Sequence, residues 1–201
     1  MKEKLRIAAL GASATAGTPG FFSPRERPPA GEGNEQSQYA YWMKNLRPEW
    51  EILNRGMRGQ RTDQILMRFD YDVLDLHPEV MILLAGTNDL YQGFPPARAL
   101  DNLKTLCQRA RVAGIRTVLA TLLPLNLGTP EVKQEILTLN LGIRELAAGK
   151  DIALADLYRV MEDPRHPGFI AGSPDEVHPD VAGYRRMGEA LVPVVETLVN
   201  C

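Results

Sequence analysis

Cysteine is scarce in this chain: its 201 residues include two, Cys107 within a helical pattern and Cys201 at the last position. Two cysteines do not make a disulfide framework, and these two lack the short spacing that a metal site requires. We therefore expect both thiols to be free and predict no metal centre.

The chain also lacks a long apolar run and an excess of charge of one sign. Its first apolar run, residues 5–10, is too short to cross a membrane and is interrupted by Arg6, which is typical of a strand and not of a signal peptide. A net charge of −2 offers no basic surface for nucleic acid or anionic lipid. We expect a small-molecule partner, no nucleic acid, no membrane span and a cytoplasmic location. A leader removed before this sequence begins would leave no trace in it, and the oligomeric state stays open.

What the sequence does have is an alternation of two patterns. Short apolar runs typical of buried parallel strands occupy residues 5–10, 50–53, 80–85, 117–122 and 152–155. Apolar residues at helical spacing lie between and after them, over residues 65–76, 100–110, 132–146 and 184–198. The length suits one domain, residues 1–201. We predict an α/β fold, a three-layer α/β/α domain with a five-stranded parallel sheet, whose ligands bind beyond the carboxyl ends of the strands.

Residues 18–38 interrupt this alternation with four prolines and three glycines, so they form a long loop. A loop of this length in a compact domain is usually functional or disordered. It follows the first strand directly, and we expect either a lid or rim over the site or a mobile surface segment. Phe21 and Phe22 are its clearest apolar residues, and they either line the entrance or anchor the loop on the core.

Ser13 lies where the first strand ends, within the small residues of the segment 11–17. A strand-to-helix turn exposes a serine hydroxyl and backbone N–H groups, as a nucleophile requires. The same pattern is also common in turns that bind a nucleotide or nothing. Residues elsewhere must decide between these interpretations.

Three histidines are candidates for a general base. His77 precedes Pro78 before the third strand, at the opposite end of the sheet from Ser13, and His166 lies in a polar loop. His178 follows the fifth strand and has Asp175 three residues before it. A serine needs a base to take its proton, and a carboxylate that orients the imidazole improves that base. The alternative is that Asp175 caps a turn and His178 faces solvent.

Acyl transfer also needs donors for the oxyanion. The third strand leads into Asn88, whose side-chain amide can point toward Ser13, and the second strand leads to Gly59, whose backbone can approach a substrate. Taken singly, both segments are ordinary turns. Asp89 is expected to cap a turn, and the arginines of this region are expected to face solvent: Arg55, Arg58 and Arg61.

Four segments in order resemble the sequence blocks of the SGNH hydrolases, also called GDSL-type esterases and lipases: GASATAG (11–17), NRGMRG (54–59), GTND (86–89) and DEVHP (175–179). The end of the chain resembles the family's last helix, with Gly183 and Tyr184 followed by Met187. The resemblance covers the whole chain and implies a flavodoxin-like sheet and no cofactor.

Carried over block by block, the resemblance implies that Ser13 is the nucleophile and that Asp175 and His178 complete a catalytic triad. It implies that the N–H of Ser13, Gly59 and Asn88 form the oxyanion hole. The family's first block usually has aspartate where this chain has Ala12, which puts in question how firmly the first loop is held. The second block also departs from the family, with Gln60 and Arg61 in place of the usual acidic residue and threonine.

We predict a serine hydrolase that cleaves short-acyl carboxylic esters through an acyl-enzyme. A long acyl chain binds well only where its methylenes are buried against apolar side chains, at about 0.8 kcal/mol for each methylene. Residues 18–38 have few large apolar side chains for this purpose. Phe21, Phe22 and Tyr91 are assigned to substrate binding. Alternatives on the same site are a lysophospholipase, a thioesterase or an acyltransferase, and a different class is a catalytically inactive flavodoxin-like binding protein. The chain has no glycine-rich phosphate-binding motif that would favour a nucleotide.

Overall fold

A computed structural model describes residues 4–149 and 151–200, so Cys201 lies outside the described residues. Its centre is the predicted five-stranded parallel sheet, in the order β4-β1-β5-β6-β7. The strands are β1 (Arg6–Gly11), β4 (Glu51–Gly56), β5 (Val80–Leu84), β6 (Arg116–Ala120) and β7 (Ile152–Ala155). Each falls on one of the five apolar runs, because a parallel strand between two helical layers is apolar on both faces.

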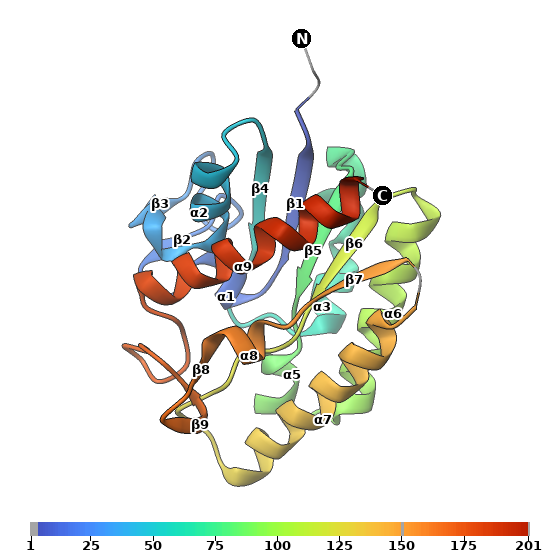
Figure 1. Cartoon of the computed structure of the whole chain (residues 1–201). Helices are drawn as coiled ribbons and strands as arrows, with labels where there is room; N and C mark the ends of the chain where they lie inside the picture. Colours follow the sequence, from blue (N-terminus) through green and yellow to red (C-terminus); the bar gives the residue numbers. More distant parts are fainter. Residues whose placement is uncertain (1–3, 150, 201) are drawn as a thin grey trace.

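Helices cover both faces of the sheet (Figure 1). One layer is formed by α2 (Tyr39–Leu46) and α9 (Val181–Asn200), which pack on each other. The other is formed by α3 (Thr62–Met67), α6 (Pro96–Val112) and α7 (Pro130–Ala147). The fold is therefore the three-layer α/β/α arrangement, with the core on both sides of the sheet.

Short elements lie at the carboxyl ends of the strands, at the lower end of the sheet in Figure 1. They are α1 (Ser13–Ala16), α5 (Thr87–Tyr91) and α8 (Leu157–Met161), which follow β1, β5 and β7. The antiparallel pair β8 (Glu162–Asp163) and β9 (His166–Ile170) lies beside them. This end of the sheet therefore carries the segments expected to hold the site.

The helical pattern predicted over residues 65–76 is broken into three pieces. They are α3, α4 (Phe69–Asp72) and a 3-10 turn at Leu74–Leu76. The stretch from Phe69 to Val73 reads Phe-Asp-Tyr-Asp-Val, and all five residue types rank low in helix propensity, so tertiary packing sets the local path.

The long loop of residues 18–38 is ordered by contacts to the sheet and to α9. Its short hairpin consists of β2 (Phe21–Phe22) and β3 (Glu32–Gly33), and a 3-10 turn follows at Glu35–Ser37. Ser23 Oγ donates a hydrogen bond of 2.6 Å to the Gly56 carbonyl, and Tyr184 Oη donates one of 2.7 Å to the Thr18 carbonyl. These contacts anchor the loop on β4 and on α9. A role of the loop as a lid or rim over the site stays a prediction.

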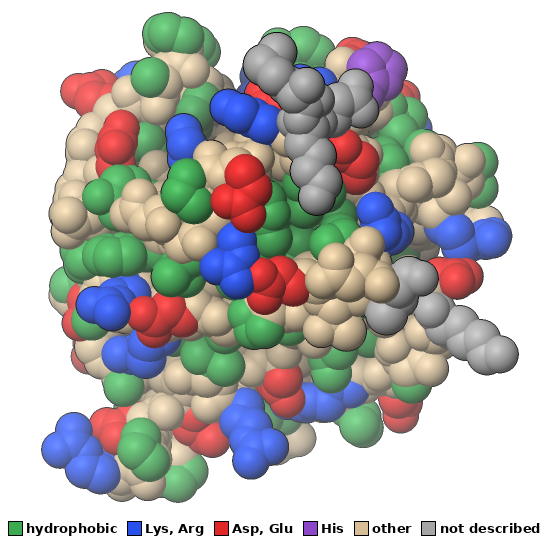
Figure 2. Space-filling view, turned by 45° about the horizontal axis from the view of Figure 1, so that its top comes forward, with side chains coloured by type: hydrophobic (Ala, Val, Ile, Leu, Met, Phe, Trp, Pro, Cys, Tyr) green, Lys and Arg blue, Asp and Glu red, His purple; other side chains and the backbone are tan. Residues whose placement is uncertain are grey.

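The opposite end of the molecule, where the strands begin, carries acidic and basic side chains side by side (Figure 2). His77 lies there, next to Lys4, Arg6 and Glu79, as its place before the third strand predicts. Across residues 4–149 and 151–200, no helix combines the length and the apolar character that a membrane span needs.

Candidate active site

Ser13 is exposed by a tight turn at the end of β1. A side chain on Gly11 would collide with Thr15 Oγ1 and the Leu84 carbonyl, at 2.2 and 2.4 Å, so only glycine lets the chain pass from strand to helix here. Gly56 at the end of β4 has similarly little room, because a β-carbon there would lie 2.1 Å from the Ala16 nitrogen. Ser13 is the first residue of α1, so its backbone N–H has no acceptor within that helix.

Ser13 contacts His178, and His178 contacts Asp175, although Ser13 is far from both in the sequence. Ser13 Oγ lies 2.8 Å from His178 Nε2, and His178 Nδ1 lies 2.7 Å from Asp175 Oδ2. Partial burial opposes ionisation of Asp175, but hydrogen bonds from the His178 ring and from the backbone N–H groups of His178 and Val177 hold its pKa below the usual value. The pair can therefore orient an imidazole whose other nitrogen accepts the serine proton.

The loop that carries this pair is fixed by the segment after β6. The Glu176 carbonyl accepts hydrogen bonds from the backbone N–H groups of Asn126 and Leu127, at 3.0 and 2.9 Å. The backbone of Glu176 has a left-handed φ of 64°, which is uncommon for a residue other than glycine. Ser173 Oγ donates to the His178 carbonyl at 2.8 Å. The position of His178 therefore depends partly on contacts with residues outside the segment 175–179.

Asn88 lies on α5 and lines the same cavity as Ser13 and His178. Its side-chain nitrogen donates a hydrogen bond of 2.9 Å to the Gln60 carbonyl, which leaves one amide hydrogen for another acceptor. Gly59, next to Gln60, is exposed and has a left-handed φ of 71°. Gly59 is therefore tied to Asn88 through its neighbour, although it does not line the cavity itself.

The cavity beside Ser13 is small and largely apolar. It measures about 30 Å³, and a water needs roughly 10–15 Å³ of such space, so it holds about two water-sized groups. Its walls are mainly aliphatic: Leu84, Ala85, Leu122, Leu123, Leu125 and Val177. Asn140, fully buried on α7, fixes Leu122 by bonding to both its N–H and its carbonyl, at 2.7 and 3.1 Å. Sequence reasoning missed this contact. The signal that could have indicated it is Asn140, a polar residue on the apolar face of the helix predicted over residues 132–146.

The residues assigned to substrate binding lie in three different settings. Phe21 is 2% exposed and packs inside its own loop against Gly31, so it anchors the loop and cannot touch a substrate in this conformation. Phe22 is partly exposed and stacks under the Arg58 guanidinium, 3.6 Å from the ring centroid. Tyr91 is 39% exposed and donates a hydrogen bond to the Leu127 carbonyl at 2.7 Å. Of the three, only Phe21 is ruled out as a lining residue, because its ring is turned inward.

The arginines expected to face solvent are instead largely engaged. Arg55 and Arg68 both bond to the fully buried Asp72. Arg68 also donates to the carbonyls of Gly11 and Arg55, each at 2.8 Å, and to Gln60 Oε1 at 2.6 Å. Arg68 thereby connects the ends of β1 and β4 with the second block, close to the turn that Ala12 left in question.

Arg58 and Arg61 are engaged as well. Arg58 donates to the Phe21 carbonyl at 2.8 Å, and Arg61 pairs with Asp63 at 3.1 Å and bonds to Gln92 Oε1 at 2.6 Å. The expectation of solvated arginines is therefore wrong for this region, because the loops at the carboxyl ends leave many carbonyls and carboxylates that guanidinium groups satisfy.

Cys107 is a free, buried thiol, as expected, and burial raises its pKa to about 12. It lies buried on α6 and lines a different cavity from Ser13. A thiol kept protonated in this way is not a nucleophile, so it does not compete with Ser13 for the role.

Comparison with known proteins gives a consistent result over most of the chain. A sequence model of the GDSL-like Lipase/Acylhydrolase family matches residues 9–186. A curated relative, the uncharacterized lipoprotein YqeF of Bacillus subtilis, is 37% identical in an alignment of 81 residues that covers 37% of this chain and 33% of that protein. The match thus spans about a third of the relative's length.

Solved structures of similar fold cover nearly all of the chain. A GDSL-like lipase from Bacteroides thetaiotaomicron has 23% identity and a TM-score of 0.77, over 98% of this chain and 90% of that one. An acetyl-xylooligosaccharide esterase from Geobacillus has 19% identity and a TM-score of 0.75, over 97% of this chain and 96% of that one. At these identities the likeness concerns the fold.

Proposed function

Because the chain belongs to the GDSL-like lipase/acylhydrolase family, we propose that it is a serine hydrolase that cleaves carboxylic esters of short acyl groups. The observation that carries the proposal is the continuous chain of contacts from Ser13 Oγ through His178 to Asp175, at 2.8 and 2.7 Å. A serine hydroxyl is a weak nucleophile without such a base, and the arrangement supplies one.

In the proposed reaction His178 Nε2 takes the proton of Ser13 as the oxygen attacks the ester carbonyl carbon. The tetrahedral oxyanion accepts hydrogen bonds from the N–H of Ser13, the N–H of Gly59 and the free amide hydrogen of Asn88. His178 then gives the proton to the leaving alcohol, and an acyl-enzyme remains on Ser13. His178 then takes a proton from water, whose oxygen attacks the acyl carbon. The bond between that carbon and Ser13 Oγ breaks, His178 returns the proton to Oγ, and the acid is released.

The preference for short acyl groups is supported by the cavity of about 30 Å³ next to Ser13. A space of this size suits an acyl group of a few atoms, whereas most of a decanoyl chain would extend beyond the aliphatic walls of the cavity. Phe22 and Tyr91 are the partly exposed aromatic residues proposed to contact the substrate beyond the cavity.

The proposal is tested with aryl esters from acetyl to decanoyl, using the wild type and Ser13→Ala. We expect turnover to be fastest from acetyl to butyryl and to be abolished by Ser13→Ala at an unchanged melting temperature. A fluorophosphonate should add one label to a peptide that contains Ser13. Turnover by Ser13→Ala would refute the assignment of Ser13 as the nucleophile. Faster hydrolysis of decanoyl than of short esters in monomeric solution would contradict the short-chain preference and favour a lysophospholipase or thioesterase.

The cytoplasmic location stays a prediction. The name lipoprotein is given to the Bacillus subtilis relative, which matches this chain over a minor part of both sequences. Fractionation of the native host, with the protein detected by antibody, decides between a cytoplasmic and an exported protein.

A further inference from the structure

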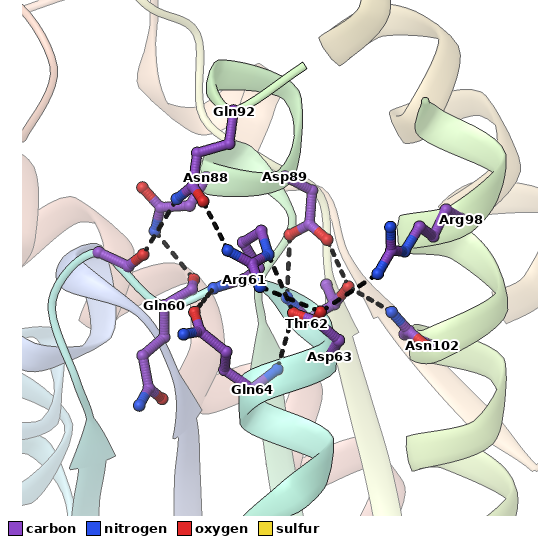
Figure 3. Close-up of polar contacts among 11 residues, drawn as sticks. Gln60, Arg61, Thr62, Asp63, Gln64, Asn88, Asp89, Gln92, Arg98 and Asn102 are labelled. Atoms are coloured by element: carbon purple, nitrogen blue, oxygen red, sulfur yellow. Dashed lines mark hydrogen bonds and ion pairs between the residues drawn. The ribbon is translucent and has the colours of Figure 1, made fainter. Parts of the chain in front are cut away.

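Two short segments carry the proposed oxyanion donors that lie outside α1, and they are joined by side chains. Residues 59–61 lead into α3, whose first residue is Thr62, and residues 87–92 include α5 (Figure 3). Gln92 Nε2 donates to the Gly59 carbonyl at 3.4 Å, and Arg61 donates to Gln92 Oε1 at 2.6 Å. With the bond from Asn88 to Gln60, the two segments are connected on their outer side.

A fully buried contact joins the same segments on their inner side. Asp89 is 2% exposed and Thr62 is 0% exposed. The Thr62 backbone N–H donates to one carboxylate oxygen of Asp89 at 2.9 Å, and its hydroxyl donates to the other at 2.6 Å. Asn102 on α6 donates to the same hydroxyl at 2.9 Å, which fixes its direction (Figure 3). Both oxygens of the carboxylate are therefore occupied by one residue.

The sequence positions of this pair matter for the site. Asp89 follows Asn88 directly, and successive residues of a helix point about 100° apart, so Asn88 lines the cavity while Asp89 points between α5 and α3. Thr62 follows Gly59 by three residues. The contact thus sets the distance between the segment of one donor and the segment of the other.

We propose that Asp89 and Thr62 are positioning residues that hold the Gly59 N–H and the Asn88 amide in the geometry of the oxyanion. The inference rests on the proposed function. Oxyanion donors must lie 2.7–3.1 Å from the oxygen that develops charge, so small displacements of either segment are costly. Burying the Asp89 carboxylate costs free energy, because burial disfavours its charged form and raises its pKa. Apolar side chains at these positions would cost less free energy to bury, but they would not orient the two segments as hydrogen bonds do.

The test compares isosteric variants of both partners on an acetyl aryl ester. Asp89→Asn removes the charge, and Thr62→Val removes the hydroxyl, while both keep the volume. We expect each to lower kcat roughly 10- to 100-fold with KM within about twofold of the wild type. Thr62→Ser, which keeps the hydroxyl, should retain kcat within about twofold. Asp101→Asn, an exposed carboxylate on α6 next to Asn102, serves as the control for loss of charge and should match the wild type.

A double-mutant cycle separates positioning from general stability. In an Asn88→Ala background one of the two positioned donors is gone, so Asp89→Asn should cost clearly less there than in the wild type. Circular dichroism monitors folding, and Thr62→Val carries the test if Asp89→Asn does not fold. Wild-type kcat in the folded isosteric variants, or an equal loss in both backgrounds, overturns the inference while Ser13-dependent turnover keeps the proposed function. Absence of Ser13-dependent turnover in the wild type overturns both.

Discussion

The chain contains two histidine–aspartate pairs with the same spacing, and their surroundings differ. In Asp163/His166 and in Asp175/His178 the carboxylate lies three residues before the histidine and contacts its Nδ1, at 3.1 and 2.7 Å. The His166 side chain is 69% exposed, whereas that of His178 is 15% exposed and has Ser13 Oγ at 2.8 Å from its other nitrogen. The local contact is therefore common to both pairs, and the partner on Nε2 distinguishes them.

The comparison shows what an Asp-x-x-His motif can and cannot do by itself. Three residues of separation bring a carboxylate to an imidazole in either loop. Ser13 Oγ and the aliphatic cavity beside it come from the segments that follow β1, β5 and β6, and His178, but not His166, lies among the residues that line this cavity. A motif search would find both pairs, and the fold selects one.

The largest difference is expected between the two histidines. His178→Ala should lower kcat by roughly 10⁴-fold or more, because it removes the group that accepts the Ser13 proton. His166→Ala, measured on the same acetyl aryl ester, should retain the wild-type rate. Equal rates in the two variants would mean that the contact to Ser13 has no role in turnover.

The two carboxylates should differ by a smaller factor. Asp175→Asn removes the charge that stabilises the imidazolium but leaves the base, so kcat should fall by roughly 10²- to 10⁴-fold, less than for His178→Ala. Asp163→Asn is the matched control, and steady-state kinetics should not distinguish it from the wild type. A loss in Asp163→Asn comparable to that in Asp175→Asn would contradict the selection of one pair.

Acid should remove the folding stability that these two carboxylates contribute. The pKa of Asp175 and that of Asp163 are both lowered in the folded protein, so each adds stability above its unfolded pKa, and that stability is lost only as the pH falls through the lower folded pKa. We expect tryptophan fluorescence to stay native above about pH 4 and the urea midpoint to fall as the pH is lowered through this value. A urea midpoint that stays constant between about pH 5 and pH 2 would contradict the lowered pKa values.

The smallest predicted effect concerns the backbone between each pair. Glu176 has a φ of 64°, whereas none of residues 163–166 has a positive φ. Glu176→Val should lower the free energy of unfolding by about 1–2 kcal/mol, because β-branched residues are strained in that region. Arg165→Val, at an exposed position of the other loop, should change it by less than about 0.5 kcal/mol. Urea unfolding of both variants measures the difference, and equal effects would show that the loop of His178 stores no strain.

The sequence by itself determined the strands and their place in the layers. Residues 80–84 and 152–155 have few alternatives to burial in a parallel sheet, because apolar runs of this length between helical patterns leave no polar face. The same holds for the end of the sheet at which Ser13, Asn88 and His178 lie, since the carboxyl ends of parallel strands share one edge. The sequence also favoured His178 over His166, by its place before the last helix.

Only the tertiary structure decided which groups touch. Ser13 and His178 are 165 residues apart, and the bond between them leaves no trace in either local pattern. The sequence did not indicate that Asp72 is buried with its arginines or Asp89 with Thr62. A charged residue is expected to be exposed unless partners for it are known, and these partners are supplied only by the fold. Local patterns record what each segment must bury, whereas a catalytic site depends on directions and distances between segments, which are set when the layers pack.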